Sequence, residues 1–378
     1  MAYPHPALLE LTAGRPLPFV EDPSVLVHSA REHRMTGLLW SVIDADQVRV
    51  PEPLRAELEQ ATLHIWGRHV RLWDVLERAA QTLGEIGVEI GTAKGVTAEA
   101  RWYDQLGHRP CADLDLFIDP GDVARIPEIV QALAPDLEDP AELGPLAQAG
   151  LIQAVNLEVE GILVDLHFDI LKMGVLTRQL KLVWDRSLAF ELESGTSVRV
   201  LDPELALIHF LLHLNRSKFQ RLLQYVDVVR ILEQEDLDWD FVDRLTRGEG
   251  IETAVRSTLT AVLEDLDRND LEPPWRPRMG WRARTWRSLW PKEVRLRGQE
   301  ALYLYPHRGK TLLPLLYRGR AVEALRTRAL LFLPPRRLVD LMHPNESGPY
   351  LKRVFMGRLH YARMRQSGRQ RTPTRLPR

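Results

Sequence analysis

Two aspartates one residue apart stand in a segment that otherwise has the pattern of a buried β-strand. The segment runs from Arg109 to Ile118 (RPCADLDLFI), and the aspartates are Asp113 and Asp115. Side chains at positions i and i+2 of a strand point to the same face, so the two carboxylates should lie side by side. Adjacent carboxylates repel each other unless a cation lies between them. Because Mg²⁺ is commonly bound by carboxylates together with nucleotide phosphates, the spacing predicts a metal-binding strand.

A later segment repeats the alternation of apolar and polar residues. Residues 151–159 and 162–170 both alternate, apart from Leu163, and Glu160-Gly161 between them favours a turn. The two runs are therefore predicted to form a β-hairpin. Its second strand would bring a third carboxylate, Asp165, to the face of the first two. Three carboxylates on neighbouring strands are typical of a two-metal site for in-line displacement at phosphorus.

Two further polar residues share the predicted face of Asp165. Asp169 competes with Asp165 for the place of the third carboxylate, and His167 either hydrogen-bonds a carboxylate or takes part in catalysis. The plain alternative is that all these aspartates line an exposed strand edge. Asp is depleted in strands, however, and its recurrence in two alternating segments favours the metal site.

The order of these motifs resembles a known family. The resemblance is to the uncharacterised bacterial nucleotidyltransferase family of the DNA-polymerase-β-like superfamily. It is carried by Lys94-Gly95, Tyr103, Arg109, Asp113-x-Asp115 and Asp165-x-His167, by His213, Lys218, Arg221 and Asp227 within the helical stretch 201–232, and by Leu333-Pro-Pro and 351–365. It covers roughly residues 20–365.

The resemblance implies transfer of a nucleoside monophosphate from a nucleoside triphosphate such as ATP to a hydroxyl group. Asp113, Asp115 and Asp165 would be the catalytic residues and the ligands of Mg²⁺ or Mn²⁺. Asp165 is the residue expected to help deprotonate the acceptor. Nucleotide contacts are expected from Lys94, Gly95, Arg109, His213, Lys218 and Arg221. The acceptor, whether a small molecule, a peptide or protein side chain or an RNA end, is not identified.

One feature departs from the superfamily pattern. Its members usually carry Gly-Ser at a helix start shortly before the paired acids, where backbone N–H groups grip the triphosphate. Here Lys94-Gly95 takes that place and the gap to Asp113 is longer. Gly95 still allows close approach of the backbone, and Lys94 can supply a point charge to a phosphate.

Several interpretations stay open at this level. Arg109 either clamps a phosphate or pairs with a surface acid. His213, Lys218 and Arg221 form either a polar wall that meets the nucleotide or a solvated helix face. Two rival functions are a non-catalytic nucleotide-binding or regulatory protein on the same fold and an RNA-modifying enzyme that uses a basic C-terminal region.

The predicted fold class is α/β, with a small mixed sheet, flanking helices and a large C-terminal helical region. Strands are expected at 88–93, 113–118, 151–159, 162–170 and 198–201, and helices at 50–60, 61–83 and 122–133. Asp202-Pro203 should start a further helix with Asp202 as N-cap. The expected segments are an N-terminal helical part at 1–88, a nucleotidyltransferase core at 89–201, a helical domain at 202–365 and a disordered basic tail at 366–378.

The formal net charge of −2 hides a strong asymmetry. Residues 275–378 hold 25 Lys and Arg against 5 Asp and Glu, whereas residues 1–274 hold 25 against 47. The basic part could contact nucleic acid, an acidic lipid surface or an acidic partner, or it could pack on the acidic front of its own chain. Leucines and aromatic residues interleaved with the arginines favour internal packing, so nucleic acid is not the favoured partner.

Composition limits the class of protein further. The single cysteine, Cys111, excludes an intrachain disulfide framework, and beside buried-type residues it is expected to be a core residue rather than a nucleophile. No apolar run reaches the length of a membrane span, and no secretory signal pattern is visible. These observations predict a cytoplasmic protein.

Overall fold

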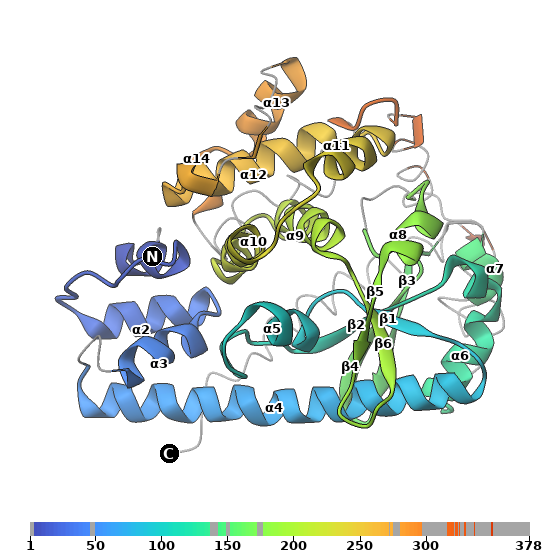
Figure 1. The fold of residues 1–378 in the computed structure, drawn as a ribbon, viewed down its shortest axis with the longest axis horizontal. Helices are drawn as coiled ribbons and strands as arrows, with labels where there is room; N and C mark the ends of the chain where they lie inside the picture. The colour runs from blue at the N-terminus through green and yellow to red at the C-terminus, as the bar shows by residue number, and fades with distance from the viewer. Residues whose placement is uncertain are drawn as a thin grey trace. The chain divides into compact units, whose positions relative to one another are not determined.

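The computed structural model describes residues 4–45, 50–136, 143–148, 152–171, 177–271, 273–274, 280–296 and 316–320, and seven positions between 322 and 350. Residues up to Ala321 form one compact unit, and the rest of the chain forms a second. The first unit holds a mixed sheet with helices on both sides of it (Figure 1). The predicted α/β class with a large helical region is therefore confirmed.

Six strands form the sheet in the order β3-β4-β2-β1-β6-β5. Strand β2 runs parallel to β4 and antiparallel to β1, and β1 runs parallel to β6. The bounds are β1 Ile90–Thr92, β2 Asp113–Ile118, β3 Ala154–Val159, β4 Ile162–His167, β5 Leu188–Glu191 and β6 Ser197–Val200. The parallel pairing of β2 with β4 puts the two acidic segments on adjacent strands at the centre of the sheet.

The hairpin prediction is confirmed. Strands β3 and β4 pair in antiparallel fashion. Glu160 and Gly161 between them both have positive φ, 51° and 75°. Two-residue hairpin turns of this kind match the right-handed twist of the strands, and glycine adopts such angles without strain. Strand β5 was not predicted, because it is a short edge strand whose side chains are largely exposed and lack an alternating apolar pattern.

The long helix α4, Glu52–Glu85, passes beneath the sheet (Figure 1). It was predicted as two helices, at 50–60 and 61–83, but no residue near position 60 breaks the backbone pattern and it continues as one helix of 34 residues. Its apolar stripe and α6, Ile126–Leu133, bury the face of β2 formed by Leu114, Leu116 and Ile118. The acidic residues of β2 therefore point to the opposite face.

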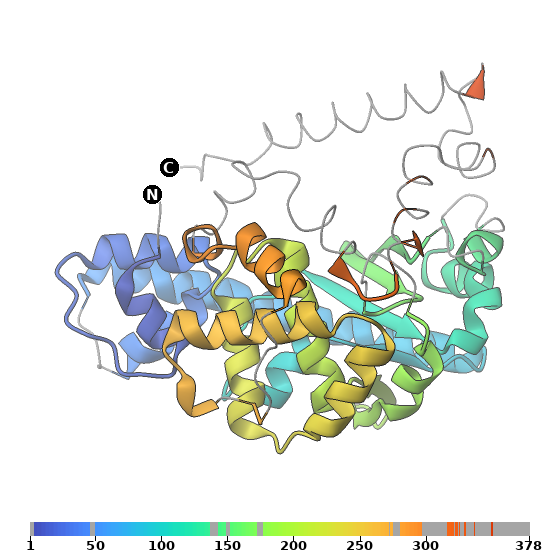
Figure 2. The same cartoon turned by 90° about the horizontal axis from the view of Figure 1, so that it is seen from above.

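The other helices lie above the sheet and at its two ends. Seen from above, α1–α3 gather at one end of α4 and α6 and α7 at the other (Figure 2). The bounds are α1 Pro6–Thr12, α2 Pro23–Glu32, α3 Thr36–Asp44, α5 Val96–Trp102, η1 Pro120–Arg125, α7 Leu143–Gln148, α8 Leu180–Arg186, α9 Pro203–Ser217, α10 Leu223–Gln234, α11 Trp239–Gly248, α12 Glu252–Leu266, η3 Asn269–Leu271, α13 Trp281–Leu289 and α14 Lys292–Arg295. Among the described helices, none is both long and apolar enough to cross a bilayer.

Helix α9 begins where the sequence predicted. Asp202 lies at its N-cap, and the Asp202 side chain accepts a hydrogen bond of 2.8 Å from the backbone N–H of Leu205. Pro203 occupies the first helical position, where its missing N–H has no intrahelical partner to lose. This start directs α9 across the polar face of the sheet.

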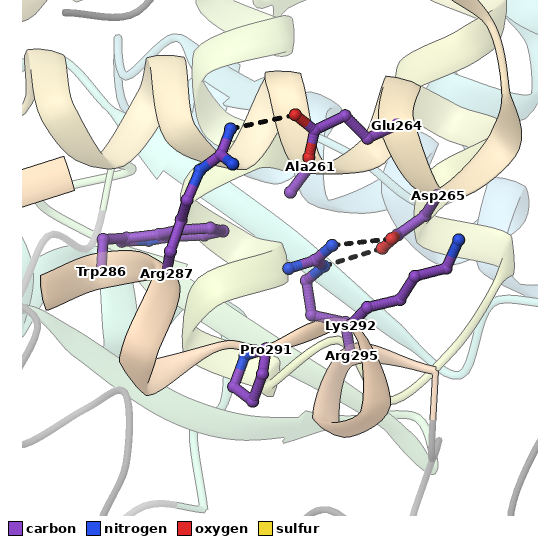
Figure 3. Close-up of a pocket in the computed structure, with 8 residues that line it drawn as sticks. All are labelled: Ala261, Glu264, Asp265, Trp286, Arg287, Pro291, Lys292 and Arg295. Atoms are coloured by element: carbon purple, nitrogen blue, oxygen red, sulfur yellow. Dashed lines mark hydrogen bonds and ion pairs between the residues drawn. The ribbon is translucent and has the colours of Figure 1, made fainter. Parts of the chain in front are cut away.

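Residues 280–296 of the basic C-terminal region pack partly on the rest of the first unit. Trp286 and Trp290 are fully buried. Arg295 of α14 makes two hydrogen bonds of 2.7 Å to the buried carboxylate of Asp265, beside a cavity of about 270 Å³ (Figure 3). These contacts agree with internal packing for residues 280–296. The apolar residues at 312–315 and 330–333 and the tail after 366 lie outside the described residues.

Substitution of Gly37 by alanine tests how the N-terminal helices contact the segment before β2. A Cβ atom at Gly37 would lie 1.9 Å from the carbonyl oxygen of Gly107, a backbone atom that cannot rotate away. We expect Gly37→Ala to lower the free energy of unfolding by about 1–3 kcal/mol, as overpacking does.

Gly67→Ala is the matched control, because Gly67 lies within α4 with nothing within 4 Å of an added Cβ. This variant should be stabilised by roughly 0.5–1 kcal/mol, since alanine favours the helix. Urea denaturation of both variants measures the difference. Equal stability of the two variants would contradict the tight contact at Gly37.

Candidate active site

Three side chains on the polar face of β2 and β4 converge. Asp115 pairs with Asp165 in the parallel register, and Phe117 pairs with His167. Asp115, Asp165 and His167 each offer one ligand atom, and these atoms all lie within 4.8 Å of one another. Asp113 was predicted as the third ligand alongside Asp115 and Asp165. It lies on the same face but outside this group, so its metal-binding role stays a prediction.

Asp115 is the most enclosed carboxylate of the converging group, with a side chain that is 2% exposed. Its Oδ2 lies 2.8 Å from Nζ of Lys94, and its Oδ1 lies 3.0 Å from Nε2 of His167. Burial opposes the charged form of Lys94, but Asp115 and Asp113 outweigh burial and raise the pKa of Lys94. A buried carboxylate between a cation and an imidazole can remain ionised, as metal binding requires.

Asp165 on β4 and Asp169, two residues after the end of β4, have different surroundings. Asp165 is partly exposed and accepts a hydrogen bond of 2.5 Å from Nδ2 of Asn156 on β3. Asp169 is buried and accepts hydrogen bonds of 2.8 and 2.6 Å from the backbone N–H and the hydroxyl of Thr177. Of the two competitors for the third carboxylate, Asp165 is therefore the one that lies beside Asp115.

Lys94 and Gly95 form the turn between β1 and α5. Gly95 has φ 74° and ψ −132°, a combination that a side chain disfavours. A Cβ atom at this position would also lie 2.9 Å from Sγ of Cys111. Glycine is thus required here for both conformation and space, and it lets Lys94 reach over the end of the sheet to Asp115.

Arg109 is paired inside the protein. Its Nε and Nη2 donate to the two carboxylate oxygens of Asp227 on α10 at 2.7 and 2.9 Å, and Tyr103 donates its hydroxyl to the same carboxylate at 2.7 Å. Burial opposes the charge on Arg109, but Asp227 prevails and raises the pKa of Arg109. Sequence reasoning left open whether Arg109 meets a phosphate or a surface acid. It meets an acid, but a buried one, so its predicted nucleotide contact has no support in this geometry.

A buried pair that sequence reasoning missed holds the segment before β2. Glu99 is fully buried and accepts hydrogen bonds from the backbone N–H groups of Gly107 and Arg109, at 2.9 and 2.7 Å. The same carboxylate contacts Nδ1 of His69 on α4, and Nε2 of His69 accepts the N–H of Cys111 at 3.1 Å. The only sequence signal was a histidine within the apolar stripe of α4.

Cys111 belongs to this packed segment. Its thiol donates to the carbonyl oxygen of Asp113 at 3.0 Å, and it packs against the hydrophobic core. Burial raises the pKa of the Cys111 thiol. These surroundings suit the expected core residue and not a nucleophile, which requires a lowered pKa.

Helix α9 presents polar residues to the acidic face. The ring of His213 stacks on that of His209 at 6.2 Å between centroids, and its Nδ1 lies 2.9 Å from Nε2 of Gln224. Burial lowers the pKa of His213 well below its usual value, with Lys94 adding to the effect, so the ring is neutral at pH 7. Lys218 is buried at the left-handed C-cap of α9.

Three arginines near the aspartates, Arg34, Arg216 and Arg221, are partly buried and have lowered pKa values. Burial lowers the pKa of Arg216, which Asp115, Asp165 and Asp113 all act to raise. Burial likewise lowers the pKa values of Arg34 and Arg221, against the attraction of Asp113. Only Arg221 was predicted. Arg34 and Arg216 gave no signal, because neither belongs to a recognisable motif.

A mixed sheet with an Asp-x-Asp strand, a third aspartate on the parallel neighbour and a Lys-Gly turn beside them is the arrangement that the sequence led us to expect of a nucleotidyltransferase. A family model described as uncharacterised nucleotidyltransferase matches residues 20–264, about two thirds of the chain, and the chain belongs to this family. Neither a search of curated proteins nor a search of solved structures found a significant match. Membership of the family indicates an enzyme.

The Lys94–Asp115 pair can be tested by a double-mutant cycle. Lys94→Met leaves a buried carboxylate without its cation, and we expect it to lower the free energy of unfolding by about 3 kcal/mol. Asp115→Asn in the same background should restore at least about 1 kcal/mol, because residues in one network are coupled. Chemical denaturation of the four proteins gives the coupling. Strictly additive losses would show that the two residues do not depend on each other.

Proposed function

We propose that this protein is a metal-dependent nucleotidyltransferase that moves a nucleoside monophosphate from a nucleoside triphosphate to a hydroxyl group and releases pyrophosphate. The observation that carries the proposal is the group formed by Asp115, Asp165 and His167 on adjacent parallel strands, in a member of a nucleotidyltransferase family. Adjacent carboxylates, one of them buried, are best stabilised by a cation.

The donor set fits Mg²⁺ or Mn²⁺. Both ions prefer carboxylate oxygens, and Mn²⁺ also tolerates an imidazole nitrogen. Asp115 and Asp165 would hold the ion, with Asp113 as a further carboxylate on the same face and His167 orienting Asp115 through their 3.0 Å contact. When bound, the ion would stabilise negative charge that develops on the phosphate oxygens.

Two cations are suited to the triphosphate. Lys94 lies on Asp115 and can exchange this carboxylate for a phosphate oxygen over a short distance. All three aspartates act on the charge of Arg216, and its side chain forms no hydrogen bond or ion pair with the described residues. A desolvated guanidinium without a carboxylate partner suits bidentate binding of phosphate. His213 lies close enough to Lys94 and Asp115 to feel their charges, and Gly95 follows Lys94 in the turn. Together with Lys218, which the family resemblance points to, they complete the nucleotide site that we propose.

Asp165 is the proposed base. It is the partly exposed member of the group, and Asn156 orients its carboxylate by a hydrogen bond to Oδ1. The acceptor oxygen would form a bond to the α-phosphorus as its proton passes to Asp165, and the bond from the α-phosphorus to pyrophosphate would break. Positioning and electrostatics carry most of the rate in reactions of this type.

A non-catalytic nucleotide-binding protein is the second candidate, favoured by one observation. Nζ of Lys94 lies 2.8 Å from Asp115, where it balances the charge that a metal would otherwise balance. An RNA-modifying enzyme has less support, because Trp286 and Trp290 of the basic region are buried and cannot stack on bases.

Binding of metal and nucleotide is the first test. We expect a non-hydrolysable nucleoside triphosphate with Mg²⁺ or Mn²⁺ to raise the melting temperature of the full chain. Ligand at about a hundred times its dissociation constant adds roughly 2.7 kcal/mol to stability. Metal alone and nucleotide with EDTA are the controls and should give smaller shifts. If none of the common nucleotides shifts the melting temperature in the presence of metal, the proposal fails.

Loss of catalysis on removal of single carboxylates separates an enzyme from a binding protein. Asp115→Asn, Asp113→Asn and Asp165→Asn should each reduce transfer of label from a radiolabelled triphosphate into cell extract by at least about 100-fold, since each removes a ligand or the base. Glu158→Gln, an exposed carboxylate on β3, is the matched control and should transfer normally. Equal transfer by all four variants would favour the non-catalytic nucleotide-binding protein. The same conclusion would follow if the unaltered protein binds nucleotide but transfers no label.

A further inference from the structure

Two arginines that are far apart in the sequence are brought together beside Asp113. Arg34 follows His33 after α2, and Arg221 precedes Leu222 before α10. The backbone N–H of Leu222 lies 3.3 Å from Nδ1 of His33, and the N–H of the next residue donates to the carbonyl oxygen of His33 at 3.4 Å. Burial lowers the pKa of His33 to about 4, so its ring is neutral and can accept this hydrogen bond at pH 7.

Further contacts place this pair next to the start of β2. Gly37 on α3 lies against Gly107, in the segment that Glu99 and His69 hold before β2. Asp113 acts on both Arg34 and Arg221, and the positive charge of Arg34 itself disfavours that of Arg221. Burial and this repulsion lower the pKa of Arg221 to about 10. The two cations therefore share one partly desolvated space with a single nearby carboxylate.

The guanidinium groups of Arg34 and Arg221 lack the direct carboxylate contact that three other enclosed arginines of the described chain make. Arg109, Arg295 and Arg320 each contact a buried carboxylate, those of Asp227, Asp265 and Glu249. Neither Arg34 nor Arg221 forms a side-chain hydrogen bond or ion pair within the described residues, and Nε of Arg221 is buried without a partner. Cations that are partly desolvated without a partner are costly in free energy. Two of them that repel each other indicate a place for an anion.

We propose that Arg34 and Arg221 bind an anionic group of the acceptor, a phosphate or a carboxylate, so that the acceptor is an anionic compound that carries a free hydroxyl. This rests on the proposed function. Guanidinium groups bind phosphate and carboxylate through paired hydrogen bonds. Of the three site aspartates, only Asp113 favours the positive charge of Arg34 and Arg221, whereas Asp115 also favours the charges of Lys94 and Arg216. Asp115 lies about 7 Å beyond Asp113 along the strand. Arg221, expected from the family pattern to contact the nucleotide, is thereby assigned to the acceptor.

The test compares two double variants of the full chain with equal loss of charge. In Arg34→Gln/Arg221→Gln the proposed anion site is removed. In Arg31→Gln/Arg244→Gln two exposed arginines are removed, one from α2 and one from α11. Inorganic phosphate is the probe, with sodium chloride at equal ionic strength as reference, and melting temperature is the readout. The non-hydrolysable triphosphate with Mn²⁺ is measured alone and together with phosphate.

We expect phosphate to raise the melting temperature of the unaltered protein and of the surface variant but not of Arg34→Gln/Arg221→Gln. That variant should melt at the same temperature as the unaltered protein or higher without ligand, because like-charge repulsion is relieved. Its response to the triphosphate with Mn²⁺ should persist, and the two ligands should give additive shifts in the unaltered protein. If the variant does not fold, Arg34→Lys/Arg221→Lys keeps the charge and should bind phosphate at least about 10-fold more weakly.

Three results would overturn the assignment. The first is a phosphate shift that persists in Arg34→Gln/Arg221→Gln or is absent from the unaltered protein. The second is loss of the triphosphate response in the same variant, which would make the arginines part of the nucleotide site and leave the proposed function standing. The third is competition between phosphate and the triphosphate instead of additivity. Failure of the proposed function has a different signature, since the unaltered protein would then not respond to the triphosphate at all.

Discussion

The parallel register of β2 and β4 is the constraint on which the site depends. It sets Asp115 directly opposite Asp165 and brings His167 within reach of both, on a face that helices cover. Carboxylates so close together require positive charge around them. Lys94 supplies it by direct contact and Arg216 from α9 at longer range. The Lys-Gly turn after β1 and the course of α9 over the sheet both serve this requirement.

A second layer of buried polar contacts holds the elements that carry these charges. Glu99 fixes the segment before β2 through two backbone N–H groups and His69, and Asp227 fixes Arg109 and Tyr103. Each carboxylate is buried with several donors, so removing one donor would leave an uncompensated charge. Such groups hold a loop more firmly than apolar packing alone, because hydrogen bonds fix direction as well as distance.

Much of the fold followed from local patterns. The period of two in β2 and β4 correctly predicted which side chains enter the core, the Glu160-Gly161 turn formed the hairpin, and Asp202 capped α9. Local patterns could not supply contacts between distant segments. No pattern tells which of the 52 acidic residues Arg109 would meet. The pairing of His69 with Glu99 and the approach of Arg34 to Arg221 depend on how helices pack, which the sequence of each helix alone leaves undetermined. The roles of the predicted site residues remain predictions.

Helix α4 has a mechanical consequence. One continuous rod of 34 residues, about 50 Å long, contacts α2 and α3 near one end and β2 and α6 near the other. Proline occurs only in its first turn, so it has no built-in hinge. Large domain closure between the N-terminal helices and the sheet would have to bend this rod. Motion during turnover is thus directed to shorter elements, and we expect the space between Arg34 and Asp113 to keep its width when a ligand binds. A binding site of fixed width selects by size as well as charge, which sets an upper limit on the acceptor groups that can reach the aspartates.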